Sequence, residues 1–294
     1  MPTELSCIDE ILVTDEGRQV GWLARGPEDG VPILYLHGCP GSRLEQRLIP
    51  YEVLCRFGAR LISVDRPGYG NTDPLGGERS ARVNDVVSLC DALSIDRFSV
   101  MGVSAGGSNV LTLAAVAPDG VTRVVSVSGQ MPYNDKESIA TLDAQQAREL
   151  PTLRVGGTAA PEEANAQWRA SLLKDPLRLF GSLATFSERE RAWFSQDWIK
   201  SVISADMREG VRSGWEGMLE DGLVCIKPFD VDVSTIRCPV RAVHGSADDW
   251  EPLPNLVRIL EQISDTQLFV LDGLNHFGPL LYPDLLMSLA LGVW

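Results

Sequence analysis

The sequence predicts an α/β fold in which a mostly parallel sheet is flanked by helices. Three observations support this prediction: short apolar runs recur along the chain, helix-length segments separate them, and one long central stretch lacks such runs. Short apolar runs of this kind are typical of strands that are buried on both faces. Strands that alternate with helices form a parallel sheet with right-handed crossovers.

The N-terminal half contains the first predicted elements. Residues 6–13 and 18–24 alternate apolar and polar side chains around Asp15-Glu16-Gly17, which indicates an antiparallel hairpin. Buried strands are expected at residues 33–36, 60–64, 98–101 and 124–127. Helices are expected at residues 44–57, 80–93 and 104–117, the last of which ends at Pro118-Asp119-Gly120.

The central stretch contains helix-like segments only. They span residues 136–150, 161–173, 188–204 and 207–219, and prolines and glycines break them. Strands are expected again at residues 240–244 and 267–271, with helices at 252–263 and 279–291. Because an insertion of about 100 residues is too long for a plain connection, we interpret it as a helical lid. Residues 1–131 and 237–294 would then form the core, and residues 132–236 the lid.

The charge and hydropathy of the chain limit its partners. A formal net charge of −14 and a pI near 4.7 disfavour nucleic acid and anionic membrane surfaces, because both attract basic proteins. Residues 1–11 show no basic leader, and no stretch approaches the roughly 20 apolar residues of a membrane span. We therefore expect a cytoplasmic protein with a small-molecule substrate, and the sequence leaves its oligomeric state open.

The six cysteines predict neither a disulfide framework nor a metal site. None of them forms a Cys-x-x-Cys pair, and no export signal is recognisable in the sequence. We expect free and mostly buried thiols, and no cofactor. The cysteines are Cys7, Cys39, Cys55, Cys90, Cys225 and Cys238.

A serine stands between an apolar run and a helix-like segment, in Gly102-Val103-Ser104-Ala105-Gly106. This order predicts a strand, a tight turn and a helix, with Ser104 at the apex of the turn. A serine hydroxyl is a poor nucleophile at neutral pH, so it needs a turn that exposes its oxygen and a base that takes its proton. The two glycines leave room for the turn, and the Ala105 N–H can stabilise a developing oxyanion. Ser104 is therefore the candidate nucleophile.

The chain has three histidines that can serve as the base: His37, His244 and His276. His37 begins a Gly-Cys-Pro-Gly loop after a strand, where backbone N–H groups can face an oxyanion, so we favour a structural or oxyanion-loop role for it. His244 is interpreted as a strand-end residue. His276 lies in the loop between the last strand and the last helix and is the favoured base, with a hydrogen-bonded loop histidine as the alternative.

With these motifs, the chain resembles the α/β-hydrolase fold family over nearly its whole length. In that family the nucleophile, the acid and the histidine follow one another in this order along the chain. The resemblance implies that Ser104 is the nucleophile, that Asp248 in a His-Gly-x-x-Asp segment is the acid, and that His276 is the base. It also implies that the Cys39 and Ala105 N–H groups form the oxyanion hole.

Three longer motifs resemble bacterial serine hydrolases of this family that carry a lid. They read His-Gly-x-Pro-Gly-Ser-Arg, Asp-Arg-Pro-Gly-Tyr-Gly and Gly-Val-Ser-x-Gly-Gly. A serine nucleophile, in place of the aspartate of haloalkane dehalogenases and epoxide hydrolases, disfavours an alkyl-enzyme mechanism. Proline iminopeptidases usually have a tryptophan after the nucleophile and a glycine at the position of Cys39, which disfavours peptidase activity.

Two neighbouring side chains compete with these assignments. Asp249 follows Asp248 and is the alternative acid, although we expect it to be a solvated surface residue. Cys39 is disfavoured as a nucleophile, because His37 is its only basic neighbour and its loop position matters through the backbone.

The substrate pocket is expected between the lid and the sheet. His37, Met131 and Trp250 are its candidate residues, and a minority of the lid aromatic side chains should join them. An apolar pocket of this kind favours a small, largely apolar carboxylic ester. The lid aromatic residues are Trp168, Phe180, Phe186, Trp193, Phe194, Trp198 and Trp215.

The predicted function is therefore a serine hydrolase that cleaves such an ester by acyl-enzyme chemistry, without a cofactor or a metal. The same triad would also serve a C–C hydrolase, a lactonase, a thioesterase or a methyl esterase. From a different class, a ligand-binding protein or a cofactor-free lyase or cyclase is the alternative. A peptidase that acts on an N-terminal residue would need lid carboxylates in the pocket, whereas Glu162, Glu163 and Asp175 are expected to face solvent.

Overall fold

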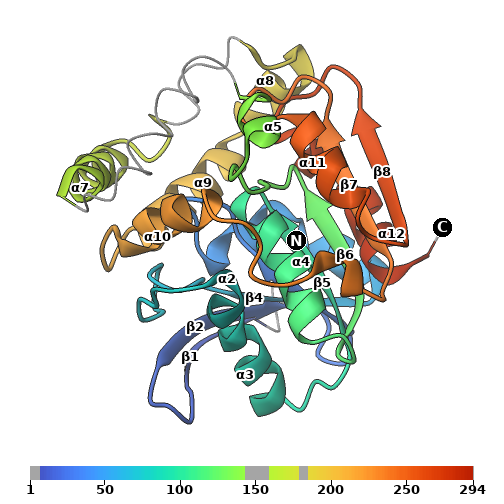
Figure 1. The fold of residues 1–294 in the computed structure, drawn as a ribbon. Helices are drawn as coiled ribbons and strands as arrows, with labels where there is room; N and C mark the ends of the chain where they lie inside the picture. Colours follow the sequence, from blue (N-terminus) through green and yellow to red (C-terminus); the bar gives the residue numbers. More distant parts are fainter. Residues whose placement is uncertain (1–6, 143–158, 179–184, 294) are drawn as a thin grey trace.

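The computed structural model describes residues 7–142, 159–178 and 185–293. Within these residues lies an eight-stranded sheet with the order β1-β2-β4-β3-β5-β6-β7-β8 (Figure 1). β2 pairs antiparallel with β1 and with β4, and all other neighbours in the sheet run parallel. The mostly parallel sheet that the sequence predicts is therefore confirmed.

Every strand expected from the sequence is present, and no strand end differs from its predicted position by more than three residues. The hairpin pairs Ile8 with Ala24 and Val13 with Gln19. The central strands are buried on both faces, as their apolar runs predict. The strands are β1 Ile8–Val13, β2 Gln19–Arg25, β3 Val31–Leu36, β4 Ala59–Val64, β5 Phe98–Val103, β6 Val121–Val127, β7 Val240–Gly245 and β8 Thr266–Leu271.

Several helices of the core are shorter than predicted. The helix expected at residues 44–57 is a 3-10 helix, η1 Arg43–Leu48, followed by a separate helix, α1 Tyr51–Phe57. Pro50 separates them, because its ring removes a backbone N–H and favours the start of a new helix. The remaining core helices are α2 Arg79–Arg82, α3 Asn84–Ala92, α4 Ala105–Val116, α11 Leu253–Leu260 and α12 Pro283–Leu291, with the 3-10 helices η4 Val233–Thr235 and η5 Gly278–Leu281.

A group of helices is inserted between β6 and β7. Figure 1 shows them on one side of the sheet, from α8 at the top to α10 at the left. They are α5 Lys136–Ile139, α7 Ala159–Lys174, α8 Glu188–Phe194, α9 Asp197–Gly210 and α10 Glu216–Cys225.

Two predictions for this insertion are wrong in their boundaries. The helix expected at residues 188–204 is divided at Ser195 and Gln196, where α8 ends and α9 begins. The helix expected at residues 207–219 does not exist as such, because α9 continues to Gly210. There it packs so closely on the loop after β3 that a Cβ on Gly210 would lie 2.3 Å from the Gly41 carbonyl oxygen. The second half of the helix expected at residues 136–150 lies outside the described residues.

The sheet divides the hydrophobic core into two clusters. On one face, Tyr35 and Met101 pack with α1, α12 and the inserted helices. On the other face, Leu34 and Val100 pack with α3, α4 and α11. Adjacent strand residues therefore point into different clusters, and the inserted helices share only one of them.

All six cysteines are free thiols, as expected, but the expectation that most are buried is wrong. Only Cys90 and Cys225 are buried, whereas Cys7 and Cys55 are exposed. In the described part of the chain, no helix has the length and apolarity that crossing a membrane requires.

Candidate active site

Ser104 occupies a strained turn between β5 and α4. Its backbone angles are φ 52° and ψ −121°, a conformation that non-glycine residues rarely adopt. Neighbouring hydrogen bonds hold this conformation: Ser104 N–H donates to the Val127 carbonyl at 2.9 Å, and the Ser104 carbonyl accepts from Gln130 N–H at 2.9 Å. A Cβ on Gly106 would lie 2.1 Å from the Leu36 carbonyl oxygen, so only glycine fits beside the turn.

The loops after β7 and β8 bring Asp248 and His276 together. His276 Nδ1 lies 2.9 Å from Asp248 Oδ2, and each side chain is only 1% exposed. Asp248 Oδ1 accepts hydrogen bonds from the Trp250 and Glu251 N–H groups at 2.9 and 3.0 Å, which fixes the carboxylate. Because Nδ1–H donates to a carboxylate, His276 Nε2 is left as the basic nitrogen.

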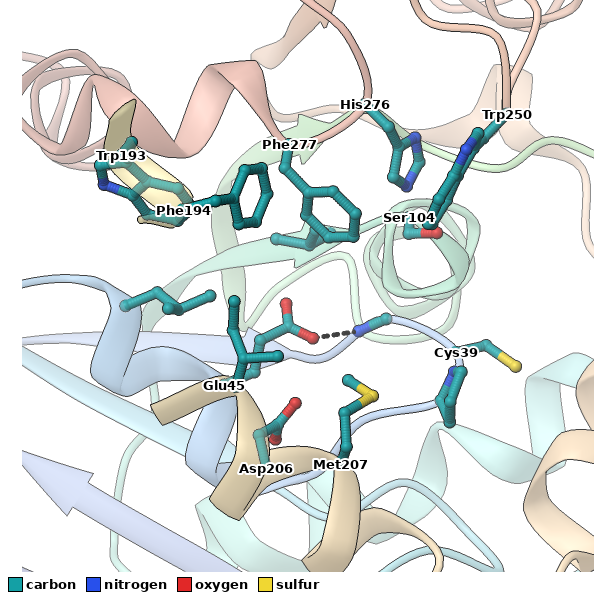
Figure 2. A pocket seen from close by; sticks show the side chains of 15 residues that line it. Cys39, Glu45, Ser104, Trp193, Phe194, Asp206, Met207, Trp250, His276 and Phe277 are labelled. Carbon is teal, nitrogen blue, oxygen red and sulfur yellow. Dashed lines mark hydrogen bonds between the residues drawn. The ribbon is translucent and has the colours of Figure 1, made fainter. Parts of the chain in front are cut away.

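His276 Nε2 is buried and has no hydrogen-bond partner among the described residues. Ser104 and His276 line the same cavity, and Figure 2 shows the imidazole ring directed toward Ser104. Trp250 stacks on the ring with centroids 5.0 Å apart and an interplanar angle of 27°. Phe277 meets the ring edge-on at 5.0 Å. The two aromatic side chains hold the imidazole in its orientation.

Asp248 and His276 each stabilise the charged form of the other. Burial lowers the pKa of His276, but Asp248 outweighs this and raises the pKa above its usual value. Burial raises the pKa of Asp248, but His276 outweighs this and lowers the pKa. The alternative acid, Asp249, is exposed. The geometry therefore favours Asp248 as the partner of His276.

His244 lies at the end of β7, as expected, and it also contacts the loop that holds Asp248. Its Nε2 lies 2.9 Å from the Glu251 carbonyl oxygen and 3.3 Å from Asp248 Oδ2. Burial lowers the pKa of His244, so the ring is neutral and its Nε2–H is the donor. His244 and Asp248 are four residues apart in the His-Gly-x-x-Asp segment, and this spacing is the sequence signal for the contact.

The loop after β3 lies on the other side of Ser104. Gly38, Cys39 and Pro40 line the cavity together with the nucleophile candidate. The Cys39 thiol accepts a hydrogen bond from Tyr69 OH at 3.2 Å. Burial, followed by the charge of Asp221, raises the pKa of this thiol, which removes it as a nucleophile.

His37 is not a pocket residue, in contrast to the expectation. It is fully buried, its Nδ1–H donates to the Gly38 carbonyl at 2.7 Å, and its Nε2 accepts from Arg66 N–H at 3.0 Å. Burial, together with the charge of Arg66, lowers the pKa of His37 well below the usual value. The neutral ring holds the loop after β3 in place through these hydrogen bonds. Met131 is not a pocket residue either, because it packs in the cluster on the α4 face of the sheet.

The cavity has mostly apolar walls. Trp250 is part of the lining, and so are Trp193 and Phe194 of the inserted helix α8. Phe180 lies outside the described residues. Glu162, Glu163 and Asp175 do not line the cavity, whereas two other acidic residues, Glu45 and Asp206, do. Sequence reasoning missed these two, because no local motif marks them.

The family follows from the comparison with known proteins. Residues 31–210 match the model of the α/β hydrolase fold family. Because this match covers more than half of the chain, the protein belongs to this family. Membership confirms the fold that the sequence predicts and the expectation of a hydrolytic enzyme.

Individual relatives are distant. A haloalkane dehalogenase from Psychrobacter cryohalolentis is 31% identical over 151 residues, and this match spans about half of each protein, 49% of this chain and 49% of the dehalogenase. A non-heme chloroperoxidase from Streptomyces lividans is 25% identical over 94% of this chain and 95% of its own length. A solved alpha/beta hydrolase fold protein from Chitinophaga pinensis has a TM-score of 0.70 at 20% identity, with 97% of this chain and 96% of the other covered. That structural likeness concerns the fold alone.

Proposed function

We propose that the protein is a serine hydrolase that cleaves a small carboxylic ester through an acyl-enzyme, with Ser104 as nucleophile, His276 as base and Asp248 as acid. One observation carries the proposal: His276 is bound to Asp248 through Nδ1, and its unpartnered Nε2 shares a cavity with Ser104. A buried base without a partner, next to a hydroxyl on a strained turn, is the arrangement that acyl transfer requires.

The chemistry follows from this arrangement. His276 Nε2 takes the Ser104 proton while Oγ attacks the ester carbonyl, and Asp248 stabilises the imidazolium that forms. The Cys39 and Ala105 N–H groups bind the oxyanion of the tetrahedral intermediate. The imidazolium then gives its proton to the departing alcohol. Water, deprotonated by His276, hydrolyses the acyl-enzyme and restores the Ser104 hydroxyl.

Residues 132–236 act as the lid in this proposal. Their helices α8 and α9 supply Trp193, Phe194, Ile203 and Met207 to the cavity, which the core lines as well. Helices that wall a cavity over the nucleophile exclude water and set the shape of the substrate.

A fluorophosphonate probe tests the proposal, because it labels only an activated serine. We expect the wild type to be labelled, and Ser104→Ala to lose both the labelling and the turnover of chromogenic short-chain esters. Ser195→Ala, at an exposed serine after α8, is the matched control. The melting temperature of each variant reports folding. A folded Ser104→Ala variant that keeps its activity, or a wild type that resists the probe, overturns the proposal.

A further inference from the structure

Two carboxyl groups line the candidate cavity on the side opposite His276 and Trp250. They belong to Glu45 in η1 and Asp206 in α9, which are 6% and 2% exposed, and we call them the acid pair. Figure 2 shows the two carboxyl groups near each other at the cavity wall. The cavity lining is otherwise mostly apolar. Its main polar side chains are the acid pair, Ser104 and His276.

The protein binds both acids through donors that hold them in place. Glu45 accepts hydrogen bonds from Tyr35 OH at 2.7 Å and from Gly38 N–H at 2.8 Å. Asp206 Oδ1 accepts from the N–H and the hydroxyl of Ser42 at 2.8 and 2.7 Å. No donor among the described residues contacts Asp206 Oδ2. One carboxyl oxygen of a cavity-lining side chain is therefore left for a ligand.

Among the described residues the acid pair has no ion-pair partner, although the charges of Arg66 and His276 lower the pKa of Glu45 from a longer distance, against the larger effect of burial. Within the described part of the chain, no lysine, arginine or histidine forms an ion pair with Glu45 or Asp206, whereas Asp65 contacts Arg43 and Asp221 contacts Arg66. Burial, followed by the charge of Glu45, holds the pKa of Asp206 well above its usual value, and burial also raises the pKa of Glu45. Burial therefore disfavours the charged form of both carboxyl groups, and a cation bound beside them would favour it.

The acid pair lies close to the reaction centre. A Cβ built on Gly38 would lie 3.3 Å from Ser104 Cβ and 3.4 Å from Glu45 Oε2. A single carbon atom would thus contact both side chains. Glu45 Oε2 therefore lies close to Ser104, so a substrate group that binds Glu45 would lie near the carbonyl carbon that Ser104 attacks.

We infer that Glu45 and Asp206 bind a protonated amino group that the substrate carries near its scissile carbonyl. The inference rests on the proposed function and names the substrate class for the same cavity. A buried carboxylate without an ion-pair partner is stabilised by a cationic ligand, and charge-assisted hydrogen bonds to Glu45 and to the open Asp206 Oδ2 give that ligand its orientation. The apolar walls accept the rest of the substrate. The substrate is thus an apolar ester with one positive charge, rather than a wholly apolar one.

Three methyl esters of nearly equal shape test the inference. Alanine methyl ester carries an ammonium group next to the carbonyl, methyl lactate carries a hydroxyl there, and methyl isobutyrate a methyl group. Released methanol is measured at about pH 7, where an α-amino group with a pKa of about 7.7–8.0 is mostly protonated. We expect kcat/KM for the alanine ester to exceed that for the isobutyrate ester at least about tenfold, the effect of one charge-assisted hydrogen bond.

Two variants locate the effect. Glu45→Gln and Asp206→Asn keep the shape of the cavity and each remove a carboxyl group that would bind the ammonium group, and we expect each to reduce the alanine-to-isobutyrate ratio at least about fivefold, mainly through KM. Asp197→Asn is the matched control, since Asp197 is an exposed acid on the same helix, α9. Circular dichroism verifies that each variant is folded.

The outcomes separate this inference from the proposed function. A wild type that fails to react with the fluorophosphonate probe overturns the proposed function. A wild type that reacts with the probe but treats the three esters alike, or prefers the lactate ester as strongly as the alanine ester, overturns the inference alone. A fall in the ratio that Asp197→Asn reproduces also overturns it, because it then reflects net charge and not the acid pair. If one variant does not fold, the other variant and the wild-type ratio decide.

Discussion

Two inserted helices each place a buried aspartate against the loop after β3, and the two aspartates have opposite surroundings. Asp221 of α10 lies 2.6 Å from Arg66 and 3.3 Å from Arg82. Burial raises its pKa, but the arginines outweigh this and hold the pKa below the usual value. Asp206 of α9 contacts Ser42 and has Glu45 as its charged neighbour, so its pKa is raised.

The difference indicates what each aspartate does. Asp221 holds Arg66, and Arg66 donates to the His37 and Gly38 carbonyl groups at 3.0 and 2.8 Å. This chain of contacts fastens the loop to α10 and leaves no charge uncompensated. Asp206 fastens the same loop through Ser42, but its Oδ2 has no donor among the described residues. The paired aspartate is thus structural, and the unpaired one is available to a ligand.

Asp248 is a third buried aspartate, and its partner is the proposed base, His276. We therefore expect its substitution to have the largest effect on activity. Asp248→Asn cannot hold the imidazole in its Nδ1–H form or stabilise the imidazolium. We expect kcat to fall by about 10³–10⁴-fold, as in other serine triads. Ester turnover is measured beside that of Asp249→Asn, the exposed neighbour. A loss confined to Asp249→Asn would move the acid role to that residue.

Asp221→Asn tests the paired side of the comparison. The substitution leaves the buried Arg66 without its full counter-charge, so we expect a loss of about 3–5 kcal/mol in unfolding free energy at neutral pH. Because folding lowers the pKa of Asp221, its contribution is present above the unfolded value of about 3.9 and is lost as the pH falls below it. The deficit of the variant should therefore shrink in acid.

Urea denaturation at a series of pH values measures this deficit. Glu220→Gln is the matched control, because Glu220 precedes Asp221 on α10, is 23% exposed and lies 3.9 Å from Arg82. We expect it to change the unfolding free energy by less than about 1 kcal/mol. A small, pH-independent effect of Asp221→Asn would contradict the structural role of the Arg66 pair.

The sequence marks the triad candidates but not the acid pair, and the reason is physical. Ser104, Asp248 and His276 each stand in a loop directly after a strand, and parallel strands bring such loops to one edge of the sheet. Asp206 meets Ser42 across 164 residues, through the packing of α9 on η1. It also falls in the gap between the helices predicted at residues 188–204 and 207–219, a gap that α9 spans in the structure. The lid acids that the sequence offers, Glu163 and Asp175, are exposed.

Asp206→Asn tests the aspartate that has no ion-pair partner among the described residues. We expect it to raise the unfolding free energy slightly, whereas Asp221→Asn lowers it. The asparagine keeps an oxygen for Ser42 and presents N–H donors to Glu45, so the buried charge gains a partner. Because folding raises the pKa of Asp206, the wild type loses stability as the pH rises above the unfolded value of about 3.9. We expect the variant to gain about 1 kcal/mol over the wild type at about pH 8, and less at about pH 4. Urea denaturation at both pH values measures the difference. A variant that is less stable than the wild type at pH 8 would mean that the acid pair is already compensated within the protein, and that Asp206 resembles Asp221 after all.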